Sequence, residues 1–274
     1  MSRLKARIKQ VTPPAIWRPA SRLYWRWYNR GQHQLVAAFS PRRWKSVQEL
    51  RNYRDRHRCH RCFILGNGPS LRRTDLSLLE REFTFGLNRI YLAFTELGFT
   101  TTYLISVNTL VIEQCADELK ALPIPKFITW RGRRWMADDP RVIFLDTDYT
   151  QPENFAEDVT GRVYEGYTVT YVALQLAFFM GFEQVILIGV DHNFTTTGPA
   201  NAVVVSGGED VDHFHPGYFG KGFRWQLPDL KGSERSYNLA KLAYERHGRQ
   251  ILDATIDGKL SVFPKVDYEG LFES

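Results

Sequence analysis

Short β-rich runs alternate with helical stretches along the chain from Cys62 onward. The β-rich runs are apolar almost throughout, which is typical of strands buried on both faces. Seven such runs are predicted as strands, at residues 62–65, 83–87, 102–107, 126–130, 141–145, 184–190 and 250–255. Helices are predicted around residues 75–82, 90–98, 109–121, 168–181 and 234–248.

This alternation predicts an α/β fold, namely a Rossmann-like, doubly wound and largely parallel sheet with helices on both faces. Residues 192–233 break the pattern because they are rich in Gly, His, Pro and aromatic residues and directly follow a predicted core strand. A connection of this length usually covers a binding site, so we predict a lid over residues 192–233, called the lid segment below. The predicted domains are an N-terminal arm, 1–58, and a nucleotide-binding domain, 59–274.

The composition of the 274 residues is that of a globular protein, with 43% hydrophobic and 24% charged residues. No apolar run reaches the roughly 18 residues of a spanning helix; the longest, Tyr171 to Phe182, contains Gln175. A transmembrane protein is thereby excluded. The absence of an apolar signal region and the small number of cysteines, three, predict a cytoplasmic protein without a disulfide framework.

The formal charge of +6 is unevenly distributed. Residues 1–61 contain 16 Lys and Arg against only Glu49 and Asp55, a net charge of +14, which leaves −8 for the rest. Four of the seven tryptophans also lie in this first segment. The basic character therefore belongs to the arm and not to the predicted domain.

A helix starting near Pro19 would place an aromatic face beside a stripe of arginines (Arg18, Arg22, Arg26 and Arg30). Such a helix suits the interface of an anionic membrane. The alternative is a helix that packs its aromatic face on the acidic body. We expect a protein attached peripherally to the inner face of the membrane, and no nucleic-acid partner, because no nucleic-acid-binding fold follows the arm.

Cys59 and Cys62 form a C-x-x-C pair flanked by His57 and His60. A structural zinc site needs four ligands, and Cys115 is the only other cysteine. The sequence therefore favours Cys62 as the start of a strand over a metal site.

Small polar residues follow four of the predicted strands. The first strand runs into Gly66-Asn67-Gly68-Pro69-Ser70, and the others into Asn88, Asn108 and Asp191-His192. Ligands of open α/β sheets bind beyond the carboxyl ends of the strands, where these side chains should meet. Asparagine offers both donors and an acceptor, and glycine lets a phosphate approach the backbone. The pattern predicts a nucleotide site, although it is neither a P-loop nor G-x-G-x-x-G.

The helix predicted from Thr168 is apolar on nearly all sides and should be buried, so its first turn is its accessible end. Thr168 and Thr170 can cap this turn. Together with the free N–H groups they can also hold a phosphate. Both interpretations remain open at this point.

The segments FILGNGPSL, FGLNRIY, SVNTL and GYTVTYVALQLAFFMGFEQVILIGVDHNF resemble two related groups over about residues 62–272. One is the family of domains similar to the 6-hydroxymethylpterin diphosphokinase MptE, some of whose bacterial members resemble parts of surface-polysaccharide or flagellin-glycosylation systems. The other is the bacterial sialyltransferase family of the Campylobacter type. The first 60 residues lie outside the resemblance.

The sialyltransferase resemblance implies a metal-independent, inverting transfer in which a lid histidine accepts the proton of the acceptor hydroxyl. His213 and His215 are the candidate bases, since imidazoles titrate near neutral pH. Tyr218 is also assigned to catalysis, and Lys221 and Arg224 are assigned to the leaving phosphate.

The residues assigned to the nucleotide are Gly66, Asn67, Gly68, Ser70, Asn88, Asn108, Thr168, Thr170, Asp191 and His192. In the sialyltransferases an aromatic pair follows G-I-D. In this sequence His192-Asn193-Phe194 replaces that pair, so the donor need not be a CMP-sugar. A packed, aromatic loop is the alternative for the lid.

The predicted function is transfer of a sugar from a nucleotide-activated, CMP-sialic-acid-like donor to a surface glycan or a lipid-linked acceptor, without a cofactor. The diphosphokinase resemblance implies instead Mg²⁺-dependent diphosphate transfer from ATP. Asp146, Asp148 and Asp191 would then be the metal ligands. A non-catalytic nucleotide-binding scaffold is the third interpretation, and a homo-oligomer is compatible with the sequence.

Overall fold

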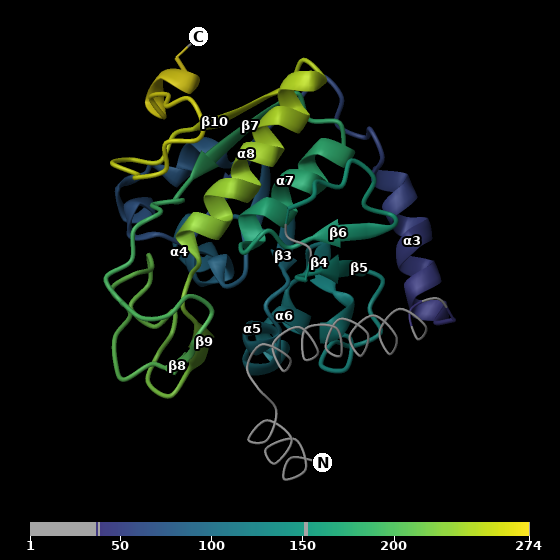
Figure 1. The fold of residues 1–274 in the computed structure, drawn as a ribbon, viewed down its shortest axis with the longest axis horizontal. Helices are drawn as coiled ribbons and strands as arrows, with labels where there is room; N and C mark the ends of the chain where they lie inside the picture. The colour runs from purple at the N-terminus through teal and green to yellow at the C-terminus, as the bar shows by residue number, and fades with distance from the viewer. Residues whose placement is uncertain (1–36, 38, 151–152, 274) are drawn as a thin grey trace, which may run out of the picture. The chain divides into compact units, whose positions relative to one another are not determined.

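A computed structural model describes residues 37, 39–150 and 153–273. The chain divides into two units, Met1–Trp44 and Lys45–Ser274, and the second contains the whole sheet (Figure 1). Helix α3 (Pro41–Tyr53) crosses this division. Its residues Leu50 and Tyr53, which the sequence analysis assigns to the arm, are buried in the core of the second unit. The predicted arginine-rich helix near Pro19 lies outside the described residues.

Eight parallel strands form one sheet in the order β10-β7-β1-β2-β3-β4-β5-β6. This confirms the predicted α/β fold. All seven predicted strands are present, and a short eighth one, β6, was missed. The strands are β1 (Arg61–Leu65), β2 (Phe83–Leu87), β3 (Tyr103–Ser106), β4 (Lys126–Thr129), β5 (Val142–Asp148), β6 (Arg162–Tyr164), β7 (Gln184–Ile188) and β10 (Gln250–Asp253).

The remaining α-helices and strands connect the strands of the sheet or belong to the lid segment. They are α4 (Phe94–Leu97), α5 (Thr109–Gln114), α6 (Ala116–Ala121), α7 (Val169–Phe179), α8 (Leu230–Arg246), and a two-stranded antiparallel ribbon of β8 (Val203–Val205) and β9 (Arg224–Gln226). The helix predicted at 109–121 is two helices, because Cys115 has a non-helical backbone. The last helix starts four residues earlier than predicted, where the side chain of Asp229 accepts a hydrogen bond from the N–H of Gly232. Residues 75–82 form only a short 3₁₀ helix at Leu76–Leu79.

Helix α7 is the centre of the core. Every residue from Thr170 to Phe179 is buried, and the helix packs across β1, β2, β3 and β6 beside α8. Its one amide side chain, Gln175, is fully buried and hydrogen-bonded. Gln175 accepts from the N–H groups of Ala156 and Tyr164 and donates to the carbonyl of Tyr164. The amide thereby fixes β6 against the helix, which compensates for its burial.

The strand order creates a switch point at β1. From β1 the chain adds strands on one side as far as β6, and then places β7 on the other side of β1. Ligands of open α/β sheets bind outside the carboxyl ends of the strands near such a point. The loops after β1 and β7 contain the predicted Gly66–Ser70 and Asp191-His192 sequences.

The C-x-x-C pair does not form a metal site. Cys59 is exposed, whereas Cys62 is buried in β1 as predicted. His57 is hydrogen-bonded to the Tyr103 hydroxyl at 2.7 Å and stacks on Phe182. Burial lowers the pKa of His57 to about 4, so this histidine is a neutral core residue at pH 7. Within the described part of the chain, no helix is both long and apolar enough to cross a membrane.

Candidate functional site

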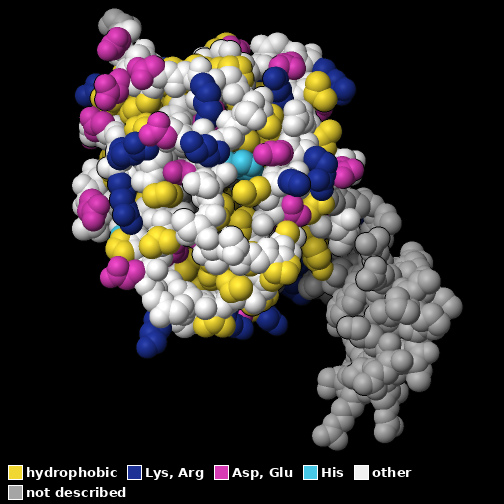
Figure 2. All heavy atoms as spheres, turned by 60° about the vertical axis from the view of Figure 1, so that its left-hand side comes forward, with side chains coloured by type: hydrophobic (Ala, Val, Ile, Leu, Met, Phe, Trp, Pro, Cys, Tyr) yellow, Lys and Arg dark blue, Asp and Glu magenta, His cyan; other side chains and the backbone are white. Residues whose placement is uncertain are grey.

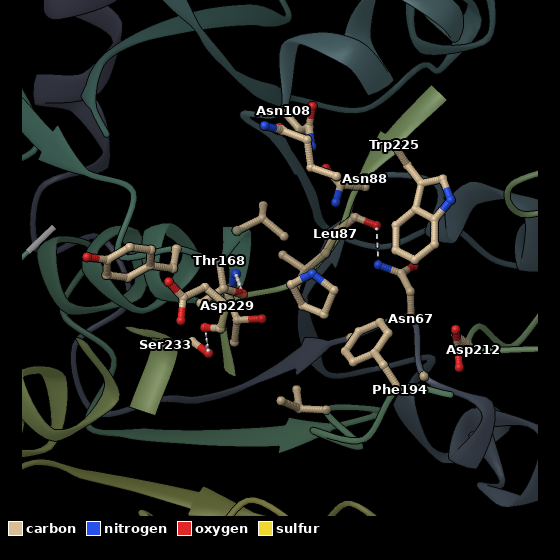
Figure 3. Close-up of a pocket in the computed structure, with 18 of the residues that line it drawn as sticks. Asn67, Leu87, Asn88, Asn108, Thr168, Phe194, Asp212, Trp225, Asp229 and Ser233 are labelled. Atoms are coloured by element: carbon tan, nitrogen blue, oxygen red, sulfur yellow. Dashed lines mark hydrogen bonds between the residues drawn. The ribbon is translucent and has the colours of Figure 1, made fainter. Parts of the chain in front are cut away.

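A pocket of about 670 Å³ lies at the carboxyl ends of the central strands. Residues after β1, β2, β3 and β7 line it together with the lid segment and the first turns of α7 and α8 (Figure 3). Its volume is within the range that holds small-molecule ligands. Most of the predicted site residues line it: Gly66, Asn67, Gly68, Asn88, Asn108, Thr168, Thr170, Asp191, His192, His213 and Tyr218.

The loops after β1 and β7 touch so closely that glycine is required at two positions. A Cβ atom on Gly66 would lie 2.2 Å from the carbonyl oxygen of Gly189. A Cβ atom on Gly68 would lie 1.8 Å from Oδ2 of Asp191. Contact between the two loops therefore accounts for these glycines without any need for a phosphate.

Asp191 holds the loop after β1 with both of its carboxylate oxygens. Oδ1 accepts from the backbone N–H of Ser70 at 3.0 Å, and Oδ2 accepts from the Ser70 hydroxyl at 2.7 Å. Ser70 is buried and is not among the residues that line the pocket. The structure thus gives Ser70 a role in fixing the loop instead of the predicted contact with a nucleotide.

The three asparagines follow one another along the edge of the sheet and differ in what they offer a ligand (Figure 3). The amide N–H of Asn67 donates to a carbonyl of β2, and its buried Oδ1 has no hydrogen-bond partner among the described residues. Asn88 accepts from the Ser106 hydroxyl at 3.0 Å, and Asn108 accepts from a backbone N–H of α5 at 2.9 Å. Asn88 and Asn108 are therefore left to donate through their NH₂ groups, whereas the amide of Asn67 is directed into the protein.

Two helices begin at the pocket. In α7, the hydroxyl of Thr168 accepts from the N–H of Thr170 at 3.3 Å, and the first turn contains no acidic residue. Burial raises the pKa of the adjacent Tyr237, although hydrogen bonds with Thr168 and Thr170 oppose the rise. Helix α8 is capped by a carboxylate, that of Asp229. Of the two helix starts, that of α7 is the one suited to an anion.

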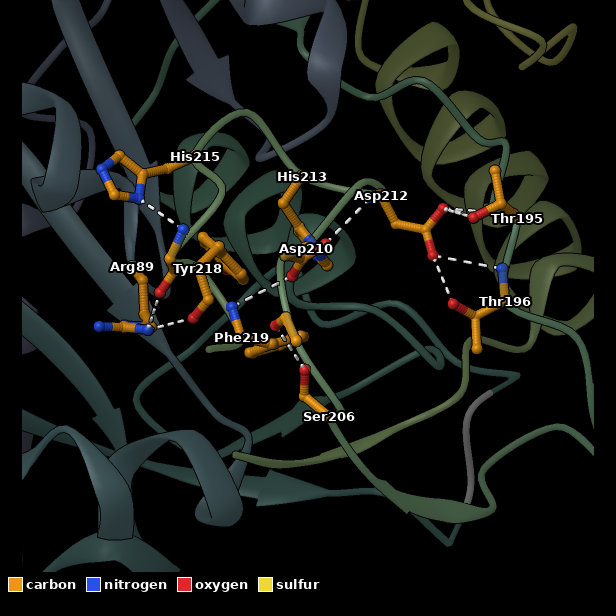
Figure 4. A network of polar contacts seen from close by, with 12 residues as sticks. Arg89, Thr195, Thr196, Ser206, Asp210, Asp212, His213, His215, Tyr218 and Phe219 are labelled. Carbon is orange, nitrogen blue, oxygen red and sulfur yellow. Dashed lines mark hydrogen bonds and ion pairs between the residues drawn. The ribbon is translucent and has the colours of Figure 1, made fainter. Parts of the chain in front are cut away.

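His213 forms a dyad with Asp210, a residue that the sequence analysis did not single out (Figure 4). Its Nδ1 lies 2.9 and 2.8 Å from the two carboxylate oxygens, and both side chains are nearly buried. Because a carboxylate only accepts, Nδ1 carries the proton and Nε2 is left as an acceptor. The imidazole also stacks on the ring of Tyr218, with centroids 4.1 Å apart. The Asp210 carboxylate and the Tyr218 ring therefore fix the imidazole in one tautomer and one orientation in the wall of the pocket.

Two arginines fix the backbone of the lid segment around this dyad. Arg72, after β1, donates to the carbonyls of His213 and Phe214. Arg89, after β2, donates to the carbonyls of Gly217 and Tyr218. The histidine is thus positioned by the same loops that provide Asn67 and Asn88.

Three predicted residues of the lid segment are not among those that line the pocket. His215 accepts a backbone N–H of its own loop through Nδ1 and lies apart from the dyad (Figure 4). Arg224 is paired with Glu113 of α5 at 3.0 Å, and Lys221 is exposed. Because side chains alternate along a strand, β9 directs Trp225 into the pocket and Arg224 away from it. We therefore assign neither His215 to catalysis nor the two cations to a phosphate.

The alternative metal ligands are not brought together. Asp191 lines the pocket, but Asp146 and Asp148 do not. One carboxylate oxygen of Asp148 accepts hydrogen bonds from both the backbone N–H and the hydroxyl of Thr150. Among the described residues, no three His, Cys, Asp or Glu side chains form a group that could hold a metal ion.

Sequence reasoning also missed pocket residues that come after the strands farthest from β1. Arg131, Tyr149 and Glu165 follow β4, β5 and β6, and Phe194 and Trp225 belong to the lid segment. For Arg131, Tyr149 and Glu165 the one available signal was their place at the ends of strands, the same signal that identified the asparagines.

The profile of one protein family, described as 6-hydroxymethylpterin diphosphokinase MptE-like, matches residues 33–197, which is more than half of the chain. The chain belongs to the MptE-like family. The match begins well before residue 62, so α3 is part of the MptE-like segment, contrary to our expectation for the first 60 residues. It ends five residues after His192, so most of the lid segment, including the dyad, lies beyond it.

No curated protein matches this MptE-like chain. Two solved structures are similar to it in fold. The MAf glycosyltransferase from Magnetospirillum magneticum AMB-1 has a TM-score of 0.47 and 13% identity, with 86% of this chain and 40% of that chain covered. The sialyltransferase CstII from Campylobacter jejuni, in complex with a substrate analogue, cytidine-5'-monophosphate, has a TM-score of 0.45 and 15% identity, with 76% and 85% covered.

Proposed function

We propose that this MptE-like protein transfers a sugar from a nucleotide-activated donor, of the CMP-sialic-acid type, to a surface glycan or a lipid-linked acceptor. The observation that carries the proposal is the His213–Asp210 dyad beside a row of asparagine amides at the switch point. A base of this kind serves a reaction in which a hydroxyl group must lose its proton as it attacks. Glycosyl transfer to a hydroxyl is such a reaction.

In the proposed step the acceptor hydroxyl attacks the anomeric carbon of the donor sugar. Nε2 of His213 takes the hydroxyl proton, while Asp210 stabilises the imidazolium that forms. The bond between the anomeric carbon and the phosphate oxygen breaks, and its electron pair leaves with the nucleotide. Attack opposite the leaving group inverts the anomeric configuration.

The departing phosphate needs donors, and the pocket offers them without Lys221 or Arg224. The NH₂ groups of Asn88 and Asn108 are directed to neither carbonyl nor carboxylate of the described residues. The first turn of α7 adds the positive end of the helix dipole.

Calorimetric titration with CMP, UDP, GDP and ATP, each with and without Mg²⁺, tests the proposal. We expect CMP to bind without metal. Asn88→Asp should weaken this binding by about tenfold or more, because it replaces an amide donor with a charged acceptor beside the phosphate. Its matched control is Asn52→Asp on the exposed side of α3, which should leave the affinity unchanged.

Binding of ATP only in the presence of Mg²⁺ would contradict sugar transfer and favour the diphosphokinase activity that gives the family its description. The described residues do not fit such a metal, since both oxygens of Asp191 are taken by Ser70 and Asp148 accepts from Thr150. Nucleotide binding without any transfer would favour the scaffold interpretation.

We also propose that the basic arm attaches the protein to an anionic membrane surface, where a lipid-linked or envelope acceptor would be found. The net charge of +14 over residues 1–61 supports this proposal. The face of the described body in Figure 2 carries basic and acidic side chains interspersed, without a continuous basic patch. An anionic surface would therefore have to be met by the arm rather than by this face.

Replacing Arg18, Arg22, Arg26 and Arg30 with glutamine in the full chain should abolish sedimentation with anionic vesicles. Each basic residue near a charged surface contributes about 1 kcal/mol, so four of them account for a large change in partition. Phosphatidylcholine vesicles are the control for charge. Equal sedimentation of the wild type and the fourfold variant with anionic vesicles would refute the attachment.

A further inference from the structure

A second polar cluster lines the same pocket. It consists of Arg131 after β4, Tyr149 after β5 and Glu165 after β6, and is called the β4–β6 subsite below. Neighbouring strands are about 4.8 Å apart, so β4 and β5 lie roughly 14 and 19 Å from β1 in the sheet order. The pocket therefore extends along the sheet past Asn108, which follows β3, to the ends of β4, β5 and β6.

The charges of the β4–β6 subsite compensate each other. Arg131 and Glu165 form an ion pair through Oε1 of the glutamate. The same oxygen accepts from the Thr147 hydroxyl at 2.6 Å, and that hydroxyl is within 2.7 Å of the Thr129 hydroxyl. Both charged side chains are largely buried, with 21% and 16% exposed. The network holds the pair rigidly in the pocket wall.

Hydrogen-bonding capacity remains on both partners of this pair. All contacts of the Glu165 side chain with the described residues are made through Oε1, so Oε2 is left to accept. Arg131 uses its Nε and one of its two terminal nitrogens, so the other NH₂ group is left to donate. An acceptor and a donor held side by side match two neighbouring hydroxyl groups, since each hydroxyl can donate and accept.

An aromatic ring completes the cluster. The guanidinium carbon of Arg131 lies 4.5 Å from the centroid of the Tyr149 ring, and 44% of Tyr149 is exposed. An aromatic face beside fixed polar groups is suited to a ligand that has both C–H and hydroxyl surfaces. Sugars have this combination.

From this geometry we infer that the β4–β6 subsite binds the sugar of the donor. The inference rests on the proposed function, because it assigns the phosphate to the start of α7 and the transferred sugar to the neighbouring subsite, where the backbone N–H of Thr168 donates to the carbonyl of Glu165 at 3.0 Å. The charges of Arg131 and Glu165 compensate each other, so the subsite is suited to the hydroxyl groups of the sugar rather than to the phosphate.

Titrations of the full chain with CMP and with CMP-sialic acid distinguish the β4–β6 subsite from the site of the nucleotide. Glu165→Gln should weaken the binding of CMP-sialic acid by about tenfold, through loss of a charged acceptor, and leave the binding of CMP within about twofold. Glu113→Gln is the matched control, because it also breaks a glutamate–arginine pair but lies outside the pocket. Equal losses for CMP and CMP-sialic acid in Glu165→Gln would overturn the assignment.

A second measurement needs no nucleotide. Saturation-transfer NMR with free glucose, galactose, N-acetylglucosamine and N-acetylneuraminic acid should show transfer from the wild type to at least one sugar, and none from Tyr149→Ala. Absence of transfer from the wild type to all four sugars would overturn the inference. Transfer that is lost in Tyr149→Ala, together with no binding of any nucleotide, would keep the sugar subsite and refute the proposed donor.

Discussion

Replacing His213 with glutamine is expected to lower turnover by about 10²- to 10⁴-fold, the usual contribution of a general base. Glutamine retains a polar side chain of similar length but cannot take a proton from the acceptor hydroxyl. Affinity for the nucleotide should stay within about twofold, because the donors of Asn88 and Asn108 are unchanged. The measurements are the initial rate of nucleotide release in the presence of acceptor, and calorimetric titration of the same protein.

Two further variants test the dyad itself. Asp210→Asn removes the carboxylate that selects the Nδ1–H tautomer, so it should reduce turnover and move the pH dependence of the rate. His215→Ala is the control, since His215 is not among the residues that line the pocket. Full activity in His213→Gln, or a loss in His215→Ala as large as that in His213→Gln, would refute the assignment of the base.

Replacing Gly66 with alanine is expected to destabilise the protein strongly. The new Cβ atom would lie 2.2 Å from the carbonyl oxygen and 2.6 Å from the carbonyl carbon of Gly189. Backbone atoms cannot move away by a change of rotamer, so β1 and β7 would have to separate at the switch point. Overpacking of this kind costs about 3 kcal/mol, or about 6 to 12 °C in melting temperature for a domain of this size.

Gly161→Ala is the matched control for this experiment. A Cβ atom there would meet nothing within 4 Å, so the melting temperature should change little. Thermal unfolding followed by circular dichroism compares the two variants with the wild type. Equal melting temperatures for Gly66→Ala and Gly161→Ala would show that the two loops are not packed as described.

The sequence predicted most of the fold because buried parallel strands leave an unmistakable apolar signature. The runs at Cys62–Leu65 and Val185–Ile188 are fully buried. Strand β6 was not predicted because it has only three residues, of which Arg162 and Tyr164 are partly exposed. Its place in the sheet depends on Gln175 in α7, a tertiary contact that no local pattern records.

The candidate site was predictable where its residues come directly after strands of a clear pattern, as Asn67, Asn88 and Asn108 do. The lid segment was not predictable in detail, because it has no repeating apolar pattern to fix which side chains point inward. Sequence alone could not show that His213 lines the pocket and His215 does not. It also could not show that the Arg224 side chain pairs with Glu113 of α5 instead of lining the pocket. Asp210 precedes His213 by three residues, but acidic residues are common in loops and only the structure joins the two.

The way in which Arg72 and Arg89 hold the lid segment has a consequence for how the protein can evolve. Both arginines bind main-chain carbonyls, which every amino acid provides. Side chains of the lid can therefore be exchanged while its path over the sheet is retained. The lid side chains that line the pocket can therefore change among descendants of this chain, with the anchoring arginines left in place.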